Sequence, residues 1–426
     1  MSFLNIRHLL IFGLFLASSA FIDPSVSYSQ NHSLSYFLNQ AYNNDPQIAS
    51  SQRNIKIADL GKRINKAMFQ KPVISGNGMA LYAPGTSKWG FGKAITNGGE
   101  YDALLNLTYP LWQSKDLRAY NLQSNSKARR ANYNLKLRKH NLKFQVTQAY
   151  IHVYGDQENI RYLHNLHQLL QQQINQLSSL VKSGIIKITD LQQVRLEDSQ
   201  IRIQLKQAKN QLVKDQSSMN QLCGIQDTTI YTIANPGLQV PSLSKKLENV
   251  RSSRFLHSYG IDSLSVEAQQ KIRDTKYLPQ ISAVANTGLS TSNLGDAANR
   301  FGFSLGLQLH WRLWDGHQQS LQRQQTKLNL ENIQDHRKFE KRRLYQQRNS
   351  LMNTLKDVQD QITDQKKQVS DYSDLLNAYR TEIDKGIQSV TSYVTVFRQY
   401  LNAKNKLNNL NIQRLQTIND LNYWNW

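Results

Sequence analysis

The stretch Phe301-Gly-Phe-Ser-Leu-Gly-Leu-Gln-Leu-His-Trp-Arg-Leu313 alternates strictly between two kinds of side chain. Its odd positions are all apolar, whereas its even positions are glycine, serine, glutamine, histidine and arginine. This alternation is typical of a β-strand with one apolar and one polar face. Directly after it, residues 316–385 contain no proline and repeat apolar residues about every 3.5 positions, from Leu344 to Ile383. The sequence therefore predicts a strand that leads straight into a very long coiled-coil helix.

The same order of elements occurs twice in the chain. Leu111-Trp112 matches Leu313-Trp314, and Gly184 matches Gly386, so both matches have the same offset of 202 residues (313 less 111, 386 less 184). Residues 114–183 form the first proline-free helical stretch. Several matches at one offset indicate two structural repeats rather than two or three unrelated domains.

Both repeats are predicted to contain helices and a pair of strands. In repeat 1 (30–228) we expect a helix over 34–70, strands over 72–83 and 101–112, a long helix over 114–183 and a helix over 187–222. A linker or equatorial segment follows over 229–254. In repeat 2 (255–426) we expect a helix over 255–276, strands over 279–290 and 301–314, a long helix over 316–385 and a helix over 388–424.

The four predicted strands have the length and pattern of membrane-spanning strands. Strands of ten to twelve residues suit a tilted crossing of the bilayer. Aromatic residues near their ends fit the membrane interface: Tyr109, Trp112, Trp311 and Trp314. A soluble sheet packed on a core by one face shows the same alternation, so the strands alone leave both interpretations open.

Stoichiometry favours the membrane interpretation. Four strands cannot close a barrel, and an open sheet edge cannot lie in lipid. Three copies would supply twelve strands, an even number within the known range. The fold class that we predict is therefore a mixed α/β membrane protein, with a transmembrane β-barrel built from four strands per protomer. Long antiparallel coiled-coil helices, forming an α-helical barrel with water on both sides, continue it.

The N-terminus reads as a secretory signal peptide over residues 1–29, with an uncertain cleavage position. Arg7 and His8 precede an apolar run from Leu9 to Phe21, which is too short for a membrane-spanning helix. Removal of residues 1–29 would leave the net charge of +22 unchanged. The mean hydropathy of −0.58 excludes a polytopic helical membrane protein.

The sequence offers no support for catalysis, a cofactor or a metal site. The single cysteine, Cys223, cannot form an internal disulfide, and no phosphate-binding or nucleophile motif occurs. His164 and His167 are the only close pair of histidines on a helix, and a solvated or packed pair is favoured over a metal site. A secreted chain with no nucleic-acid-binding module is not expected to bind nucleic acid. The positive charge is interpreted first as solvated helix surface and second as a lining that favours anions.

Several short motifs resemble the outer membrane efflux protein family of TolC-like channels. They are Asn44-Asp-Pro46, Pro110-Leu-Trp112, Leu313-Trp-Asp-Gly316, Ser183-Gly-Ile-Ile-Lys-Ile-Thr-Asp-Leu191 and Lys385-Gly-Ile-Gln-Ser-Val-Thr-Ser-Tyr393. Each motif is weak alone, but their order and duplication are specific, and they span the mature chain. The resemblance implies a porin-like, homotrimeric exit duct in the outer membrane, with a helical extension into the periplasm. It also implies a periplasmic adaptor and an inner-membrane transporter, of the efflux or ABC type, as partners in drug efflux or type I secretion.

The resemblance also implies site residues at two helix-hairpin tips. Adaptor docking is expected at Ser183, Gly184, Thr189, Asp190, Leu191, Lys385, Gly386, Ser392 and Tyr393. Gate candidates are Asp190, Glu382, Asp384, Gln388, Ser392 and Thr395. Asp190 has an alternative role in capping the second helix through the Thr189-Asp190 pair. The aspartates that ring the constriction in the best-known member correspond here to Ser392 and Thr395, so the gate chemistry differs.

Two other functions fit part of the sequence. A periplasmic adaptor also uses long helical hairpins, but it does not need two strand pairs about 200 residues apart. A structural coiled-coil protein of the envelope would leave the alternating strands unexplained. The exit duct accounts for both kinds of element.

Overall fold

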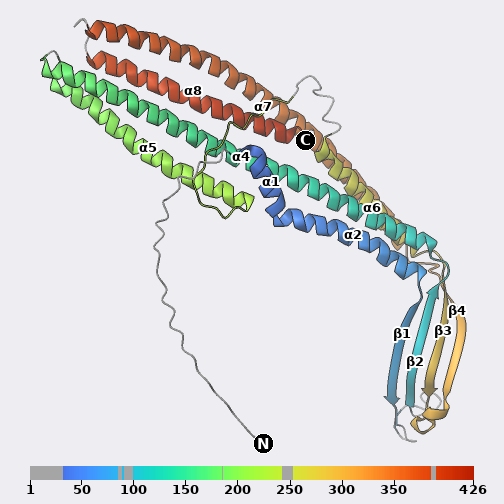
Figure 1. The fold of residues 1–426 in the computed structure, drawn as a ribbon. Helices are drawn as coiled ribbons and strands as arrows, with labels where there is room; N and C mark the ends of the chain where they lie inside the picture. Colours follow the sequence, from blue (N-terminus) through green and yellow to red (C-terminus); the bar gives the residue numbers. More distant parts are fainter. Residues whose placement is uncertain (1–31, 85–88, 91–98, 185, 242–252, 385–389) are drawn as a thin grey trace, which may run out of the picture.

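The computed structural model describes residues 32–84, 89–90, 99–184, 186–241, 253–384 and 390–426. These residues form an elongated bundle of helices with one small β-sheet at its end, bent away from the helix axes (Figure 1). The predicted signal peptide over 1–29 lies outside the described residues. No described helix has the length and apolar composition that a membrane crossing requires.

The elements follow the predicted order. The first half contains α1 (Leu34–Asn44), α2 (Pro46–Gln70), β1 (Val73–Tyr82), β2 (Gly99–Pro110), α4 (Ser114–Lys182) and α5 (Ile188–Cys223). The second half contains the 3₁₀ turn η3 (Arg254–Leu256), α6 (His257–Thr275), β3 (Gln280–Thr291), the 3₁₀ turn η4 (Leu294–Asn299), β4 (Phe301–His310), α7 (Gln318–Asp384) and α8 (Val390–Trp424).

Two long helices run the length of the bundle. Helix α4 has 69 residues and α7 has 67, so each is roughly 100 Å long. Each stays continuous because no proline interrupts its backbone hydrogen bonds. Helix α5 folds back along α4 and α8 folds back along α7, which gives two antiparallel hairpins (Figure 1). Near the sheet, α2 packs beside α4 and α6 lies between α4 and α7.

The hairpins pack through narrow apolar seams. The largest cluster joins both hairpins toward their tips and includes Leu166 and Leu170 of α4 with Val396 and Phe397 of α8. A second cluster fixes α1 against α4 and α5, with Phe37 and Tyr150 fully buried. Most of the remaining helix surface is polar, as the coiled-coil pattern predicts, although some large apolar side chains of α2 and α7 are exposed.

The four strands form one antiparallel sheet in the order β1-β2-β3-β4. Each half supplies one hairpin, and β2 pairs with β3 to join the halves. The registers Leu107↔Ala285 and Leu307↔Ala283 place the apolar odd positions of β2, β3 and β4 on one face. Within the described chain, β1 and β4 each have one unpaired edge.

The predicted single helix over 34–70 is wrong, because α1 ends and α2 begins around Asp45. Pro46 lacks an N–H and starts α2 at its first turn. The Asp45 carboxylate accepts a hydrogen bond from the Ile48 N–H at 2.8 Å, which caps α2. Asp45 also forms an ion pair with Arg138 of α4, and this contact fixes the bend against the long helix.

Several predicted boundaries also differ from the structure. The strand predicted over 301–314 ends at His310, and the one predicted over 101–112 runs from Gly99 to Pro110. The helix predicted over 255–276 starts with a 3₁₀ turn and ends at Thr275. Residues 242–252 of the predicted linker lie outside the described residues, whereas Tyr231 and Ile233 pack against α1 and α4.

Candidate functional site

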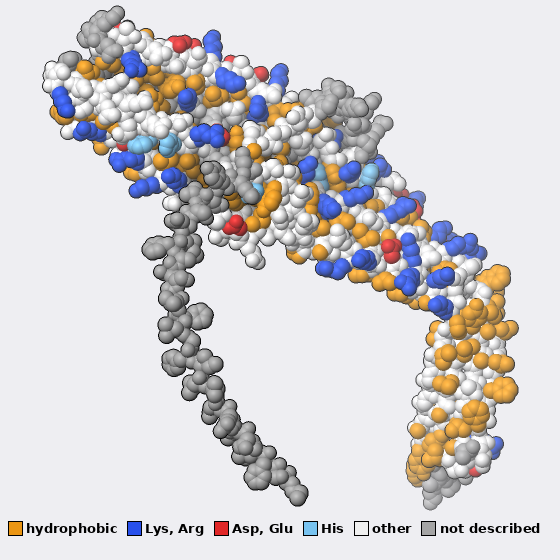
Figure 2. Space-filling view, in the orientation of Figure 1, with side chains coloured by type: hydrophobic (Ala, Val, Ile, Leu, Met, Phe, Trp, Pro, Cys, Tyr) orange, Lys and Arg blue, Asp and Glu red, His pale blue; other side chains and the backbone are white. Residues whose placement is uncertain are grey.

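One face of the sheet is apolar and uncovered in the protomer. On β4, Phe303 is 81% exposed and Leu305 is 78% exposed, and the other odd positions of this strand are exposed too. Hydrophobic side chains gather over the sheet in Figure 2, in contrast to the mixed surface of the helices. An apolar surface of this kind in a folded protein indicates contact with a partner or with lipid.

The other face of the sheet is polar. The Ser304 hydroxyl donates a hydrogen bond to the Asn286 side-chain oxygen at 2.8 Å, across β4 and β3. Asp102 and Asn106 of β2 share the even-numbered face, as the sequence predicts. A sheet with lipid on one face and water on the other has this distribution of side chains.

The four aromatic residues that the sequence singles out lie at the end of the sheet next to the helices. Tyr109 is near the end of β2, and Trp112 lies between β2 and α4. Trp311 and Trp314 lie between β4 and α7, and Trp314 is 80% exposed. These four residues therefore lie together at one end of the sheet. Three aromatic residues that the sequence analysis missed are exposed at the opposite end: Tyr82, Trp89 and Phe301.

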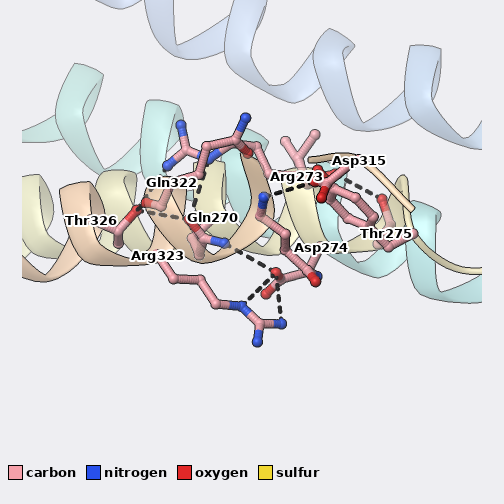
Figure 3. Close-up of polar contacts among 11 residues, drawn as sticks. Gln270, Arg273, Asp274, Thr275, Asp315, Gln322, Arg323 and Thr326 are labelled. Carbon is pink, nitrogen blue, oxygen red and sulfur yellow. Dashed lines mark hydrogen bonds and ion pairs between the residues drawn. The ribbon is translucent and has the colours of Figure 1, made fainter. Parts of the chain in front are cut away.

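A polar network joins the ends of α6 and α7 next to the sheet (Figure 3). The Tyr277 hydroxyl donates a hydrogen bond to the Asp315 carboxylate at 2.5 Å, which holds the pKa of this carboxyl below its usual value. Asp315 also accepts a hydrogen bond from the Gln319 N–H at the start of α7. Asp315 therefore fixes the turn after α6 to the N-terminus of α7.

The same network continues between α6 and α7. Asp274 of α6 pairs with Arg323 of α7 at 3.1 Å. The Thr326 hydroxyl of α7 donates to the Gln270 side-chain oxygen at 2.7 Å and accepts from Arg273 at 2.9 Å. These contacts join the last turns of α6 to the first turns of α7 next to the sheet (Figure 3).

The tip of the first hairpin joins α4 to α5. Gly184 has φ of 72°, so this glycine permits the left-handed backbone with which α4 ends. Ser183 and Thr189 are exposed, whereas Leu191 is buried among the helices. Asp190 does not cap α5, because the helix begins at Ile188 with Lys187 as its N-cap. Its carboxylate instead lies in the first helical turn, where negative charge is favoured.

The tip of the second hairpin lies partly outside the described residues, which end at 384 and resume at 390; Lys385, Gly386 and Gln388 fall in this gap. Among the described candidates, Glu382 and Thr395 are exposed and Ser392 is half-buried. Asp384 is the last residue of α7. Tyr393 is buried and stacks on Phe397 with ring centroids 6.0 Å apart, and burial raises its pKa. Leu191 and Tyr393 are therefore packing residues in the interior of the tips, and their side chains are not on the surface.

An ion pair that the sequence analysis missed joins the two hairpins near these tips. Arg398 of α8 pairs with Glu197 of α5. A groove of about 330 Å³ also lies between the hairpins, lined by residues of α4 and by Arg380, Ile383 and Tyr393. Heptad spacing predicts which side chains pack within one hairpin, but it does not predict how two hairpins contact each other, so this ion pair could not be found from the sequence.

Within the described residues, the histidine pair of α4 has no further metal ligands grouped around it. His167 contacts the Asp198 carboxylate of α5 at 2.5 Å, which is a packed arrangement between two helices. Among the described residues, no group of histidine, cysteine, aspartate and glutamate side chains has the geometry to hold a metal ion.

Two carboxyl groups meet in the middle of the first hairpin. Asp156 of α4 faces Asp215 of α5, and burial together with this neighbouring carboxyl raises the pKa of Asp156 to about 7. The Gln211 side chain donates a hydrogen bond to Asp215 at 3.1 Å. Asp156 therefore keeps its proton up to about neutral pH.

Comparison with known families identifies this architecture. The family model described as "Outer membrane efflux protein" matches residues 37–225 and 263–423, which include both long helices and all four strands. The chain belongs to the outer membrane efflux protein family. Membership places the protein in the outer membrane with its helical part in the periplasm. A comparison with proteins of curated function gives no match.

Solved structures of outer-membrane channels share the fold over nearly the whole chain. CusC superposes with a TM-score of 0.76 at 14% identity, covering 93% of this chain and 94% of CusC. VceC from Vibrio cholerae gives 0.73 at 13% identity, covering 92% and 95%. The Campylobacter jejuni CmeC outer membrane channel gives 0.71 at 13% identity, covering 98% and 94%. The similarity confirms the predicted fold class of an outer membrane efflux protein.

Proposed function

We propose that this outer membrane efflux protein forms a homotrimeric exit duct that works with a periplasmic adaptor and an inner-membrane transporter. One observation carries the proposal. A sheet with an exposed apolar face and two unpaired edges continues directly into two helices roughly 100 Å long. The sheet suits a membrane barrel and the helices suit a tube that reaches across the periplasm.

Both edges of the protomer support assembly with further copies. The unpaired edges of β1 and β4 need partner strands, because lipid cannot satisfy backbone hydrogen bonds. Helix α2, which leads into β1, exposes an apolar stripe of Ile57, Leu60, Ile64 and Met68. Helix α7, which follows β4, exposes Leu321 and Leu328. Packing of α2 on α7 of the next copy would cover both stripes while β1 pairs with β4.

The two alternative functions leave the main observation unexplained. An adaptor or a structural coiled-coil protein in the periplasm would expose Phe303 and Leu305 to water. Each of these side chains loses about 1.5–3 kcal/mol of burial free energy when it is left in water. The exit duct places the same side chains in lipid.

The tips are the proposed adaptor contacts. Ser183 and Thr189 are exposed on the first tip, and the groove lined by Arg380, Ile383 and Tyr393 opens between the hairpins. We assign the contact to 183–191 and 385–393 together with this groove. Gate candidates remain Asp190, Glu382, Asp384, Gln388, Ser392 and Thr395, to which the Glu197–Arg398 link is added.

Membrane fractionation with gel analysis tests the trimer. Protein extracted from the outer membrane and left unheated should migrate at three times the monomer mass and collapse to the monomer on heating. A strictly monomeric species, or extraction with the inner membrane, would contradict the proposal.

A bulky substitution at the tip tests docking. Thr189→Trp adds a large side chain at an exposed tip position, and it should abolish transport-dependent resistance or secretion while the trimer still forms. Gln207→Trp is the matched control, because Gln207 is exposed on the same helix away from the tip. Equal activity of the two variants would remove 183–191 from the docking surface.

Deletion of the gene separates the two kinds of cargo. Increased susceptibility to drugs with an unchanged set of secreted proteins would assign efflux. Loss of one secreted protein with unchanged susceptibility would assign type I secretion, and co-purification after crosslinking would then identify the transporter.

A further inference from the structure

A groove lined by basic side chains lies on the helix ends that adjoin the apolar sheet. It has a volume of about 600 Å³ and is formed by the first turns of α4, the last turns of α6 and the first turns of α7. Four of its lining residues are cations: Lys115, Arg118, Lys271 and Arg323. Its only acidic lining residue is Asp274.

The charge of this groove is not neutralised within the protomer. Asp274 is already paired with Arg323. Lys115, Arg118 and Lys271 are exposed, and no ion pair joins any of them to an acidic residue in the described part of the chain. Three cations therefore face the groove with no protein counter-ion, so the groove suits an anion.

The groove lies at the end of the bundle that adjoins the sheet, because its residues belong to the helix ends next to the strands. Figure 2 shows hydrophobic side chains gathered over the sheet and Lys and Arg side chains gathered over the neighbouring helix ends in one view. Exposed Trp112 and Trp314 lie between the strands and these helix ends. From the strands toward the helices, the surface therefore changes from apolar to aromatic and then to basic.

This order of surfaces matches the layers of a phospholipid monolayer. Acyl chains contact apolar strands, the interface contacts aromatic rings, and the phosphate lies one layer further out. The groove also contains Ala119, Leu122 and Leu278, which can contact the glycerol and upper acyl region of a lipid. A free inorganic anion would gain nothing from these apolar side chains.

We propose that this groove binds the headgroup of an anionic phospholipid from the periplasmic leaflet of the outer membrane. The proposal rests on the proposed function, because it needs the sheet to span that membrane. Lys115, Arg118 and Lys271 contact the phosphate, and the Asp274–Arg323 pair, held by the network of Figure 3, shapes the groove wall. Each cation near an anionic lipid surface contributes roughly a fivefold preference.

Lipid retention by the trimer tests the proposal. Trimers are purified in detergent with an equimolar mixture of phosphatidylglycerol and phosphatidylcholine, and the retained lipids are counted by native mass spectrometry. The wild-type protein should retain phosphatidylglycerol at least about tenfold over phosphatidylcholine. Lys115→Gln/Arg118→Gln/Lys271→Gln should bring this ratio close to one.

The control variant carries the same change in net charge. Lys206→Gln/Lys209→Gln/Lys214→Gln removes three exposed cations of α5, far from the sheet (Figure 1), and should keep the wild-type ratio. An equal loss in both variants, or no preference in the wild type, would overturn the proposal. Displacement of phosphatidylglycerol by inorganic phosphate at matched ionic strength would also overturn it, in favour of a free-anion site.

The unheated gel separates this proposal from the proposed function. If the wild-type trimer forms but shows no preference between the lipids, the headgroup site is refuted and the exit duct is unaffected. If the wild-type chain forms no trimer, both the exit duct and the headgroup site are refuted.

Discussion

Leucine has opposite surroundings in the sheet and in the helical wall. Leu142 of α4 is completely buried, whereas Leu305 of β4 is 78% exposed. The wall buries leucines such as Leu142 in a narrow seam, and its other faces carry mostly polar side chains. The sheet presents its leucines outward instead, and its polar face lies on the other side. The two regions therefore fold against different solvents, water for the wall and lipid for the sheet.

The largest expected effect comes from the buried leucine of the wall. Leu142→Ala creates a cavity and should cost about 2–5 kcal/mol of unfolding free energy. Leu305→Ala removes the same atoms from an exposed position and should cost less than about 1 kcal/mol. Thermal or urea unfolding of detergent-purified protein measures both. Similar losses would show that Leu305 is buried in the assembled protein.

A charge on the sheet should have the next largest effect. Leu305→Lys places an ammonium group in the apolar face, which costs about 2–4 kcal/mol near the bilayer centre. The yield of heat-modifiable trimer in the outer membrane should fall several-fold. Gln308→Lys, on the polar face of the same strand, is the control and should assemble normally. Loss of assembly in both variants would contradict a water-filled side of the sheet.

Much of this contrast can be predicted from the sequence. The strand faces follow from strict alternation, and the long helices follow from the apolar repeat and the absence of proline. The bend at Asp45 was missed, although the Asp-Pro signal for a new helix start was present. The Glu197–Arg398 contact could not be predicted, because the lateral packing of two hairpins depends on helix rotation. The basic groove likewise assembles from three helices that are distant in sequence.

Close packing of the sheet gives a third, smaller effect. A Cβ at Gly288 would lie 2.0 Å from the Ala103 carbonyl oxygen, with φ of 147°, so Gly288→Ala must displace β2. We expect a loss of about 1–3 kcal/mol, seen as a lower temperature of trimer dissociation. Gly302, its partner on β4, has open space at the same position. Gly302→Ala should therefore dissociate at the wild-type temperature, and equal effects would contradict the register.

The smallest effect is a pH dependence of the wall. The folded protein holds a proton at Asp156 up to about pH 7, whereas the unfolded chain releases it near pH 3.8. The stabilisation from this proton is therefore fully present below about pH 3.8. It decreases as the pH rises to about 7, above which no further stability is lost. Solvent screening limits the loss to about 1 kcal/mol.

Asp156→Asn mimics the protonated form and isolates this contribution. Its unfolding temperature should equal the wild-type value at low pH and exceed it above neutrality. Asp335→Asn, at an exposed position of α7, should leave the wild-type pH profile unchanged. A wild-type profile that is retained in Asp156→Asn would place the titration elsewhere.

Site-directed spin labelling of the sheet tests the central claim most directly. Single cysteines at Leu305 and Gln308 are labelled in trimers reconstituted into bilayers, with buried Cys223 replaced by serine. We predict that the label at 305 collides with oxygen and is shielded from a water-soluble nickel complex, whereas the label at 308 shows the reverse. Equal access of the nickel complex to both labels would contradict a sheet that separates lipid from water.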